Sequence, residues 1–366
     1  MKNTFGTSVA VTLYGESHGA AIGAILDGMA PGIPVDSDFI AAQMRLRQSV
    51  AALSTARHEA DTVEILSGVY DGKTTGTPIC LQIRNTAQHS DDYQKNAQLV
   101  RPGHADFTAH DKYHGCEDAR GGGHFSGRIT AGLVAAGAIA ISALRARGIL
   151  IGTHIARLAD VCDRPFHATP ATDIAALATM PFAVLDAAAA VRMQEKIAAA
   201  RADGDSVGGV LETCVVGLPA GVGEPWFDTL EGVLAHGLFS IPAVKGVEFG
   251  DGFRLAELYG STANDAFVAK DGNVTTATNR MGGILGGISN GMPLVIRTAV
   301  KPTPSIYKPQ QTVSLSGEPA TLSIVGRHDP AIVHRVRVVA DSVVALVLCD
   351  MLALRYGTDW LSGGVQ

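Results

Sequence analysis

The chain has 366 residues, of which 46% are hydrophobic, 17% charged and only 5% aromatic, and its formal net charge is −6. This composition predicts a large core built mainly from Ala, Val, Ile and Leu. Because the net charge is acidic and the arginines occur singly or in pairs, a nucleic-acid-binding surface is also disfavoured.

Cysteine usage and hydropathy predict the cellular compartment of the protein. The five cysteines are scattered and form no CxxC pair, which argues against a disulfide framework and a zinc site and favours a reducing compartment. The N-terminal residues contain no apolar signal core, and the longest apolar run, 131–144, is too short to span a bilayer. We therefore expect a cytoplasmic protein without a membrane segment.

The hydrophobic periodicity predicts helices and strands along the whole chain. In chain order these are a strand at 6–14, an amphipathic helix at 37–47, strands at 62–69 and 78–84, and a long apolar helix from about Ser126 to Arg147. There follow a helix at 183–202, a strand at 207–217, a helix at 226–238, strands at 244–249, 292–300 and 321–326, and a second apolar helix from about Pro330 to Tyr356.

The order of these elements favours an α+β fold over regular βαβ winding. Gly148 and Gly357 are natural stops for the two long helices, which are apolar on most faces and should be covered on several sides. The Pro- and Ser-rich stretch 301–319 reads as an ordered loop, so we expect a single domain over residues 1–366. A glycine-and-basic motif precedes each long helix, which indicates an internal pseudo-repeat.

The stretch "RGGGHFSGR" (120–128) leads into the first long helix. Ser126 is placed as an N-cap, and three glycines allow backbone N–H groups to turn toward an anion at the helix N-terminus. Arg120 and Arg128 would add charge-assisted contacts. The alternative is a glycine-rich turn flanked by surface arginines, and the stretch alone does not decide between the two.

Three acid–base residues stand in separate turns. His18 lies in "YGESHG", where a lone histidine is more often structural than catalytic. His104 lies in "RPGHAD", where a hydrogen bond between His104 and Asp106 would by itself close the turn. Asp329 in "VGRHDP" has the position of a helix N-cap followed by Pro330 as first helical residue. Each residue therefore has a structural interpretation beside a catalytic one.

Other loops carry glycines and cations. The stretch 280–293 is glycine-rich but matches neither the dinucleotide-binding nor the P-loop pattern, and "KPTPSI" (301–306) offers a lysine and hydroxyls to a phosphate. Arg45, Arg47 and Arg57 stand in or near the first helix, where a solvated face is the alternative. Taken together, glycine, arginine and histidine loops at the edges of apolar elements predict one site for a multiply anionic small molecule.

These motifs resemble the chorismate synthase family. "YGESHG", "RPGHAD", "RGGG–FSGR", "SIPAVKGVEFGDGF", "GGILGGISNG", "KPTPSI" and "GRHDP" occur in that family's order and spacing over nearly the whole chain. The resemblance implies a β-α-β sandwich with central apolar helices between antiparallel or mixed sheets, assembled as a homotetramer. It also implies a lyase that converts 5-enolpyruvylshikimate 3-phosphate into chorismate and phosphate with reduced FMN and without net redox change.

The resemblance assigns roles to residues of this chain. His18 would protonate the leaving phosphate, His104 would hold the reduced flavin, and Asp329 would assist the departure of the proton at flavin N5. FMN contacts are implied for His124, Phe125, Ser126, Gly286, Lys301, Pro302, Thr303, Pro304, Ser305 and Arg327. The anions of the substrate are implied to bind Arg45, Arg47, Arg101, Arg128 and Arg327. No metal is expected.

Two stretches depart from the family pattern. Many relatives have "GRSSARE" where this chain has "GHFSGRI", so His124 replaces an arginine. Many have "RRRPG" where this chain has "RLRQS", and Leu46 and Ser49 break that pattern. The individual arginine assignments therefore stay open, as does the choice between NADPH and an external flavin reductase as the source of electrons.

Three other classes of function compete with this interpretation. A non-catalytic flavin- or phosphate-binding protein would need the glycine loops but not two histidines and an aspartate in separate motifs. An NAD(P)-dependent dehydrogenase is disfavoured because no GxGxxG follows the first strand. A metal-dependent hydrolase would use His18, His104, His328 and Asp329, but no pair among them has helical ligand spacing.

Overall fold

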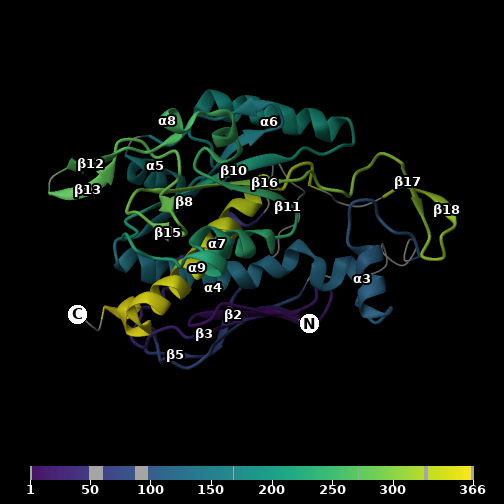
Figure 1. Cartoon of the computed structure of the whole chain (residues 1–366). Helices are drawn as coiled ribbons and strands as arrows, with labels where there is room; N and C mark the ends of the chain where they lie inside the picture. The colour runs from purple at the N-terminus through teal and green to yellow at the C-terminus, as the bar shows by residue number, and fades with distance from the viewer. Residues whose placement is uncertain are drawn as a thin grey trace.

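The fold consists of two antiparallel sheets with helices between them (Figure 1). The computed structural model describes residues 2–48, 61–86, 98–167, 169–270, 272–324 and 329–363. The first sheet contains, in spatial order, β1 (Thr4–Phe5), β2 (Ala10–Gly15), β3 (Ala21–Asp27), β7 (Ile79–Arg84) and β4 (Glu64–Ser67). The second contains β11 (Val244–Phe249), β16 (Leu294–Val300), β10 (Gly209–Val216), β8 (Leu150–Leu158) and β9 (Val161–Cys162).

Two long helices fill the space between the sheets. α4 (Thr130–Ala146) packs on β3 and β7 of the first sheet, whereas α9 (Val333–Tyr356) packs on β8 and β10 of the second. The helices also pack on each other, and a Cβ at Gly137 would lie only 2.2 Å from Cβ of Ser342, so glycine permits this close approach. The predicted α+β sandwich with central apolar helices is thus confirmed.

Further helices cover these layers. α7 (Leu230–Phe239) packs on α9, and α1 (Ser37–Leu46) packs on α4. α5 (Pro170–Leu177) and α6 (Ala187–Ala202) lie outside the second sheet, above it in Figure 1. This outer layer explains why β8 and β10 are buried along most of their length.

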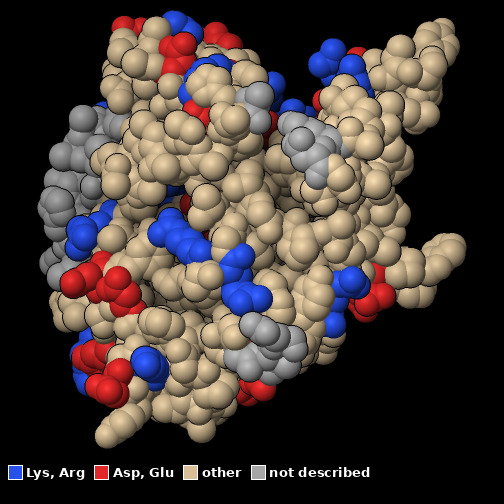
Figure 2. All heavy atoms as spheres, turned by 90° about the vertical axis from the view of Figure 1, so that its left-hand side faces the viewer, with Lys and Arg blue, Asp and Glu red and all other residues tan. Residues whose placement is uncertain are grey.

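Short elements complete the chain. α3 (Asp106–Tyr113) and α8 (Gly260–Ala263) are isolated short helices. Two-stranded ribbons are formed by β5 (Val69–Tyr70) with β6 (Lys73–Thr74), β12 (Phe267–Lys270) with β13 (Asn273–Thr276), β14 (Ile284–Leu285) with β15 (Ile288–Ser289), and β17 (Gln310–Val313) with β18 (Pro319–Leu322). On the face shown in Figure 2, a group of Lys and Arg side chains lies near the middle, whereas Asp and Glu lie mainly towards the rim.

The apolar segment Gly127–Ala146 is long and apolar enough to cross a membrane by length and composition, with a mean hydropathy of 1.7. However, 83% of the 18 residues over which this hydropathy is averaged are buried inside the protein. There α4 contacts α9, α1 and the first sheet. The apolar character of this segment is therefore explained by its place in the core.

Most predicted elements are present, with shifted ends. The first long helix begins at Thr130, after a 3-10 turn at Gly127–Ile129 whose N-cap is Ser126. The second begins at Val333 rather than Pro330. Of the strand predicted at 321–326, the first two residues belong to β18, which ends at Leu322, and residues 325 and 326 lie outside the described part of the chain. The predictions missed β3, β8, α3 and α5, because their short or glycine-containing patterns have no clear period.

A buried ion-pair cluster connects the second sheet to its outer layer. His154 of β8 is fully buried, and its Nδ1 lies 2.7 Å from Asp163 while its Nε2 lies 3.3 Å from Glu212. Asp163 also accepts hydrogen bonds from the backbone N–H groups of Leu185 and Asp186, just before α6. Because both ring nitrogens must donate, the cluster requires the imidazolium form. Burial opposes that form, but the two carboxylates outweigh it and raise the pKa of His154.

We expect this cluster to make stability depend on pH. With a raised folded-state pKa, the contribution of His154 is fully present below about pH 6.5 and is lost as the pH rises through the folded-state pKa. His154→Gln should lower the free energy of unfolding by about 3–5 kcal/mol at pH 6 and flatten this dependence. Urea unfolding between pH 6 and pH 9 measures both effects.

The matched control is His167→Gln, because His167 also contacts a carboxylate, Asp173 at 3.0 Å, but its side chain is 61% exposed. This variant should stay close to the wild type at every pH. If the free energy of unfolding changed with pH in the same way in the wild type and in His154→Gln, the assignment of a charged imidazole would be wrong.

Candidate active site

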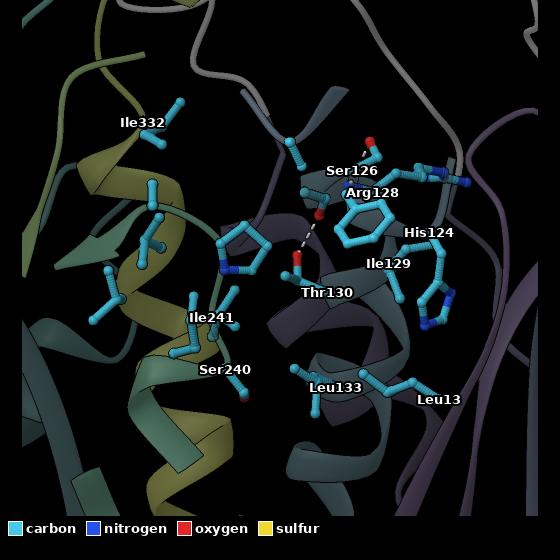
Figure 3. A pocket seen from close by; sticks show the side chains of 18 of the residues that line it. Leu13, His124, Ser126, Arg128, Ile129, Thr130, Leu133, Ser240, Ile241 and Ile332 are labelled. Atoms are coloured by element: carbon cyan, nitrogen blue, oxygen red, sulfur yellow. Dashed lines mark hydrogen bonds between the residues drawn. The ribbon is translucent and has the colours of Figure 1, made fainter. Parts of the chain in front are cut away.

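A cavity of about 930 Å³ lies at the N-terminal ends of the two central helices. Figure 3 shows Thr130 and Leu133 of α4 on one wall and Ile332, Ile241 and Ser240 on the other. The floor is apolar, and polar side chains from several loops converge on it, which is the usual construction of a small-molecule site. Each of these loops contains a motif singled out in the sequence.

The glycine loop 120–125 lies against both histidines. Gly121, Gly122 and Gly123 have φ values of 61°, 93° and 53°, a backbone region that other residues rarely adopt. A Cβ on Gly121 would lie 2.0 Å from His18 Cε1, and one on Gly122 would lie 3.2 Å from His104 Cε1. The glycines therefore serve two purposes, because they permit the turn and leave space for two imidazoles.

His18 is buried in the cavity wall, with 7% of its surface exposed. It follows β2, and its Nδ1 lies 3.2 Å from the hydroxyl of Ser17. That hydroxyl also donates to the carbonyl of Arg120 at 3.2 Å. The ring is thus held by the Ser17 hydroxyl at Nδ1 and by the glycine loop, which lies against Cε1 and Nδ1.

His104 belongs to a three-residue cluster. Its Nδ1 lies 2.7 Å from Asp106, which also accepts two side-chain hydrogen bonds from Arg101, at 2.6 and 2.7 Å. Burial alone would raise the pKa of the Asp106 carboxyl, but the hydrogen bonds from Arg101 and His104 hold it well below its usual range. The contact between His104 and Asp106 does close the turn, and the same contact orients the imidazole at the cavity.

Two arginines share a buried carboxylate. Arg128, after Ser126, binds Asp61 and also donates to Asn85 at 3.2 Å. Arg47, at the C-terminal end of α1, lies 3.7 Å from Asp61 and donates to the backbone carbonyl of Arg128 at 3.0 Å. Arg47 is only 4% exposed. Since one carboxylate faces two guanidinium groups, this part of the cavity wall keeps a positive charge.

Asp329 is not a helix cap. The N-cap of α9 is Ile332, which makes no side-chain capping bond, and Asp329 instead accepts a 2.5 Å hydrogen bond from Arg335. Arg335 also donates to the carbonyl of Arg47 at 2.9 Å. The interpretation of Asp329 as N-cap with Pro330 as first helical residue is therefore wrong, because the helix begins one turn later.

The loop 301–305 forms another side of the cavity. The Lys301 ammonium donates to the carbonyl of Gly103, and burial together with the nearby Lys245 lowers the pKa of Lys301. Thr303 lines the cavity, and among the described residues its buried hydroxyl has no hydrogen-bond partner. A polar group of a ligand would satisfy that hydroxyl and the lysines.

The structure brings most of the predicted site residues together. The cavity lining includes His18, Arg47, Arg101, His104, His124, Phe125, Ser126, Arg128, Lys301, Thr303, Pro304, Ser305 and Asp329. It does not include Arg45, Gly286 or Pro302, all of which are exposed. Arg327 lies outside the described residues.

Sequence reasoning missed several polar residues of the cavity. Ser17, Asp61, Lys245 and Arg335 line it and were not singled out. Ser17 had a signal in its place inside the "YGESHG" motif, directly before His18. Asp61 had none, because its partner Arg128 lies 67 positions away, and Arg335 stands six residues after Asp329 but outside any recognised motif.

The glycine loop yields a test of this geometry. Gly121→Ala should displace His18 and lower turnover about a hundredfold, as expected for a misplacement of about 1 Å. The positive φ should also cost about 1–2 kcal/mol of stability. Steady-state turnover and thermal unfolding of the variant measure the two effects.

Gly127→Ala is the control in the same segment. Gly127 has no positive φ, and a Cβ there would meet nothing within 4 Å. We expect it to retain wild-type turnover. Full turnover in Gly121→Ala would mean that the loop does not fix His18.

Comparisons with known proteins agree with this site. A family model described as "Chorismate synthase" matches residues 9–353. The chorismate synthase of Methanosarcina barkeri is 47% identical over 357 residues, 97% of each chain, and that of Thermococcus kodakarensis is 45% identical over 351 residues, 96% of this chain and 97% of its own. A solved structure described as "Crystal Structure of Chorismate Synthase" matches with a TM-score of 0.77 and 30% identity, over 96% of this chain and 94% of that chain.

Proposed function

Because this chain belongs to the chorismate synthase family, we propose that it converts 5-enolpyruvylshikimate 3-phosphate into chorismate and phosphate. The reaction is an anti 1,4-elimination, catalysed by a carbon–oxygen lyase (EC 4.2.3.5) as the last step of the shikimate pathway. Phosphate leaves one ring carbon and hydrogen leaves another. The site must therefore bind a phosphate and two carboxylates, donate a proton and accept one.

We propose reduced FMN as the cofactor. It would supply transient electron density that helps to expel phosphate. The cavity fits such a group, because an apolar floor suits a flat ring system and Lys301, Lys245 and the unsatisfied hydroxyl of Thr303 suit a phosphate. His124, Phe125, Ser126, Pro304 and Ser305 would complete the cofactor site, and Gly286, Pro302 and Arg327 stay proposals without support from the described cavity.

The acid–base roles follow from the chemistry. His18 would donate a proton to the leaving phosphate oxygen, because it is a buried imidazole inside the cavity. His104 would face the reduced flavin, with its other ring nitrogen held by Asp106. Asp329 would take part in removing the proton, since it lines the cavity as a carboxylate and caps no helix.

The arginines would bind the anionic groups of the substrate. Arg128 and Arg47 support this role best, because the two cations face one carboxylate, that of Asp61. Arg101 lines the cavity but is bound to Asp106 through two side-chain nitrogens. Arg45 of α1 is exposed and does not line the cavity, so its role as a substrate-binding residue has no support from the described cavity.

One observation carries the proposal: three motifs far apart in the sequence bring His18, His104 and Asp329 into one cavity that is also lined by arginines and lysines. The test adds substrate to the protein with chemically reduced FMN under anaerobic conditions and measures released phosphate and chorismate. We expect both products in equal amounts, and none with oxidised FMN or without flavin. Tight flavin binding without phosphate release would favour a non-catalytic flavin-binding protein.

The organisation of the protein is also a proposal. We propose a single domain, assembled as a cytoplasmic homotetramer without nucleic-acid or membrane partners. Light scattering after gel filtration measures the oligomer. Adding NADPH and oxidised FMN in place of reduced FMN would show whether this chain reduces its own flavin or depends on an external flavin reductase.

A further inference from the structure

We propose that Asp106 is a positioning residue that fixes His104 as the Nδ1–H tautomer and turns Nε2 toward the glycine loop. A carboxylate only accepts hydrogen bonds, so the 2.7 Å contact between Asp106 Oδ1 and His104 Nδ1 requires a hydrogen on Nδ1. The tautomer follows from geometry alone, and the inference rests on the proposed function only where it expects a loss of turnover.

Arg101 faces the same edge of the ring. Its Nη2 lies 3.1 Å from His104 Nδ1 and 2.6 Å from Asp106 Oδ1. If Nδ1 instead accepted a hydrogen bond from Arg101, its lone pair would face a lone pair of Asp106 Oδ1 at 2.7 Å, which is repulsive. The carboxylate therefore decides the tautomer, and Arg101 holds the carboxylate in place.

Arg101 holds Asp106 through three hydrogen bonds. Oδ2 of Asp106 accepts from Arg101 Nε at 2.7 Å and from the Arg101 backbone N–H at 2.9 Å. Together with Nη2, two of the three guanidinium nitrogens are engaged. Arg101 thus acts on His104 through Asp106.

The opposite edge of the ring is where chemistry can occur. A Cβ on Gly122 would lie 3.3 Å from His104 Nε2, so this nitrogen faces the glycine loop at the cavity. Lys301, which donates to the carbonyl of the adjacent Gly103, lines the same cavity, and Arg101 Nη2 would lie 3.9 Å from the same Cβ. With Nδ1–H bound to Asp106, Nε2 can take up and release a proton while the ring stays oriented.

Asparagine at position 106 should reverse the tautomer. The amide can take two orientations. With its NH2 at the place of Oδ2, it would face two donors of Arg101, the backbone N–H and Nε. With its NH2 at the place of Oδ1, it would face one donor of Arg101, Nη2, and also His104 Nδ1. The second arrangement has fewer opposed donors, and in it Nδ1 becomes an acceptor. His104 would then carry its hydrogen on Nε2 and lose the acceptor that faces the cavity.

The experiment is nitrogen NMR of full-length, flavin-free protein with isotope-labelled histidine, in which His104→Gln identifies the His104 signals among the 12 histidines. We expect Nδ1–H signals in the wild type and Nε2–H signals in Asp106→Asn. Turnover of Asp106→Asn should fall about a hundredfold or more, as when the orienting carboxylate of a catalytic histidine is removed. Asp111→Asn, an exposed acid on the same helix, should match the wild type in both.

Two variants keep the inference falsifiable. An unchanged Nδ1–H pattern in Asp106→Asn would overturn it. If that variant does not fold, Arg101→Gln is measured instead: Asp106 is intact there, so Nδ1–H should persist, and a reversed tautomer would show that Asp106 is not the determinant. Because no flavin or substrate is present, the NMR result is independent of whether the wild type releases phosphate.

Discussion

His18→Ala is expected to lower turnover by about a hundred- to ten-thousandfold, the usual contribution of a positioned acid or base. Phosphate is a poor leaving group unless its bridging oxygen receives a proton or a positive contact. His18 is the buried imidazole of the cavity wall, held by Ser17 and the glycine loop. Phosphate release with reduced FMN under anaerobic conditions measures the loss, and His104→Ala should show a loss of the same order.

The control for His18 is another histidine of the same cavity. His236 of α7 also lines it but packs edge-to-face on Phe5, with ring centroids 5.0 Å apart. His236→Ala should therefore stay within severalfold of wild-type turnover. If His18→Ala also keeps near-wild-type turnover while remaining folded, protonation of the leaving phosphate must be assigned to a different group.

The site was predictable where its requirements are local. A run of glycines with positive φ, a serine that caps a turn and a histidine two residues before an aspartate in "RPGHAD" are readable because the interacting atoms are close in sequence. The long apolar helices were readable for a related reason. Burial on all sides leaves an uninterrupted apolar pattern whatever the neighbouring elements are.

The sequence does not predict pairings between distant segments. Asp61 binds Arg128, 67 positions away, and Arg335 donates to the carbonyl of Arg47, 288 positions away. Neither contact has a local pattern, because each exists only after the sheets and helices have packed. β8 has no clear period for a related reason, since it is buried on both faces, by α9 on one side and by α5 on the other.

The structure also changes the prediction for Asp329. An N-cap aspartate can be replaced by asparagine at almost no cost, because the amide oxygen caps equally well. Asp329 has no such role, since α9 begins at Val333 with Ile332 as its N-cap. Its carboxylate contacts Arg335 at the edge of the cavity, where asparagine can still accept that hydrogen bond but cannot act as a base.

We therefore expect Asp329→Asn to lose turnover nearly as severely as Asp329→Ala, by about a hundred- to ten-thousandfold, while its melting temperature stays close to that of the wild type. Asp36→Asn is the matched control, because Asp36 does cap α1, accepting from the backbone N–H groups of Asp38 at 2.9 Å and Phe39 at 3.0 Å. That variant should keep both stability and turnover. Full activity in Asp329→Asn would reduce Asp329 to a partner of Arg335, because a residue that removes a proton needs its charge and one that only orients an arginine does not.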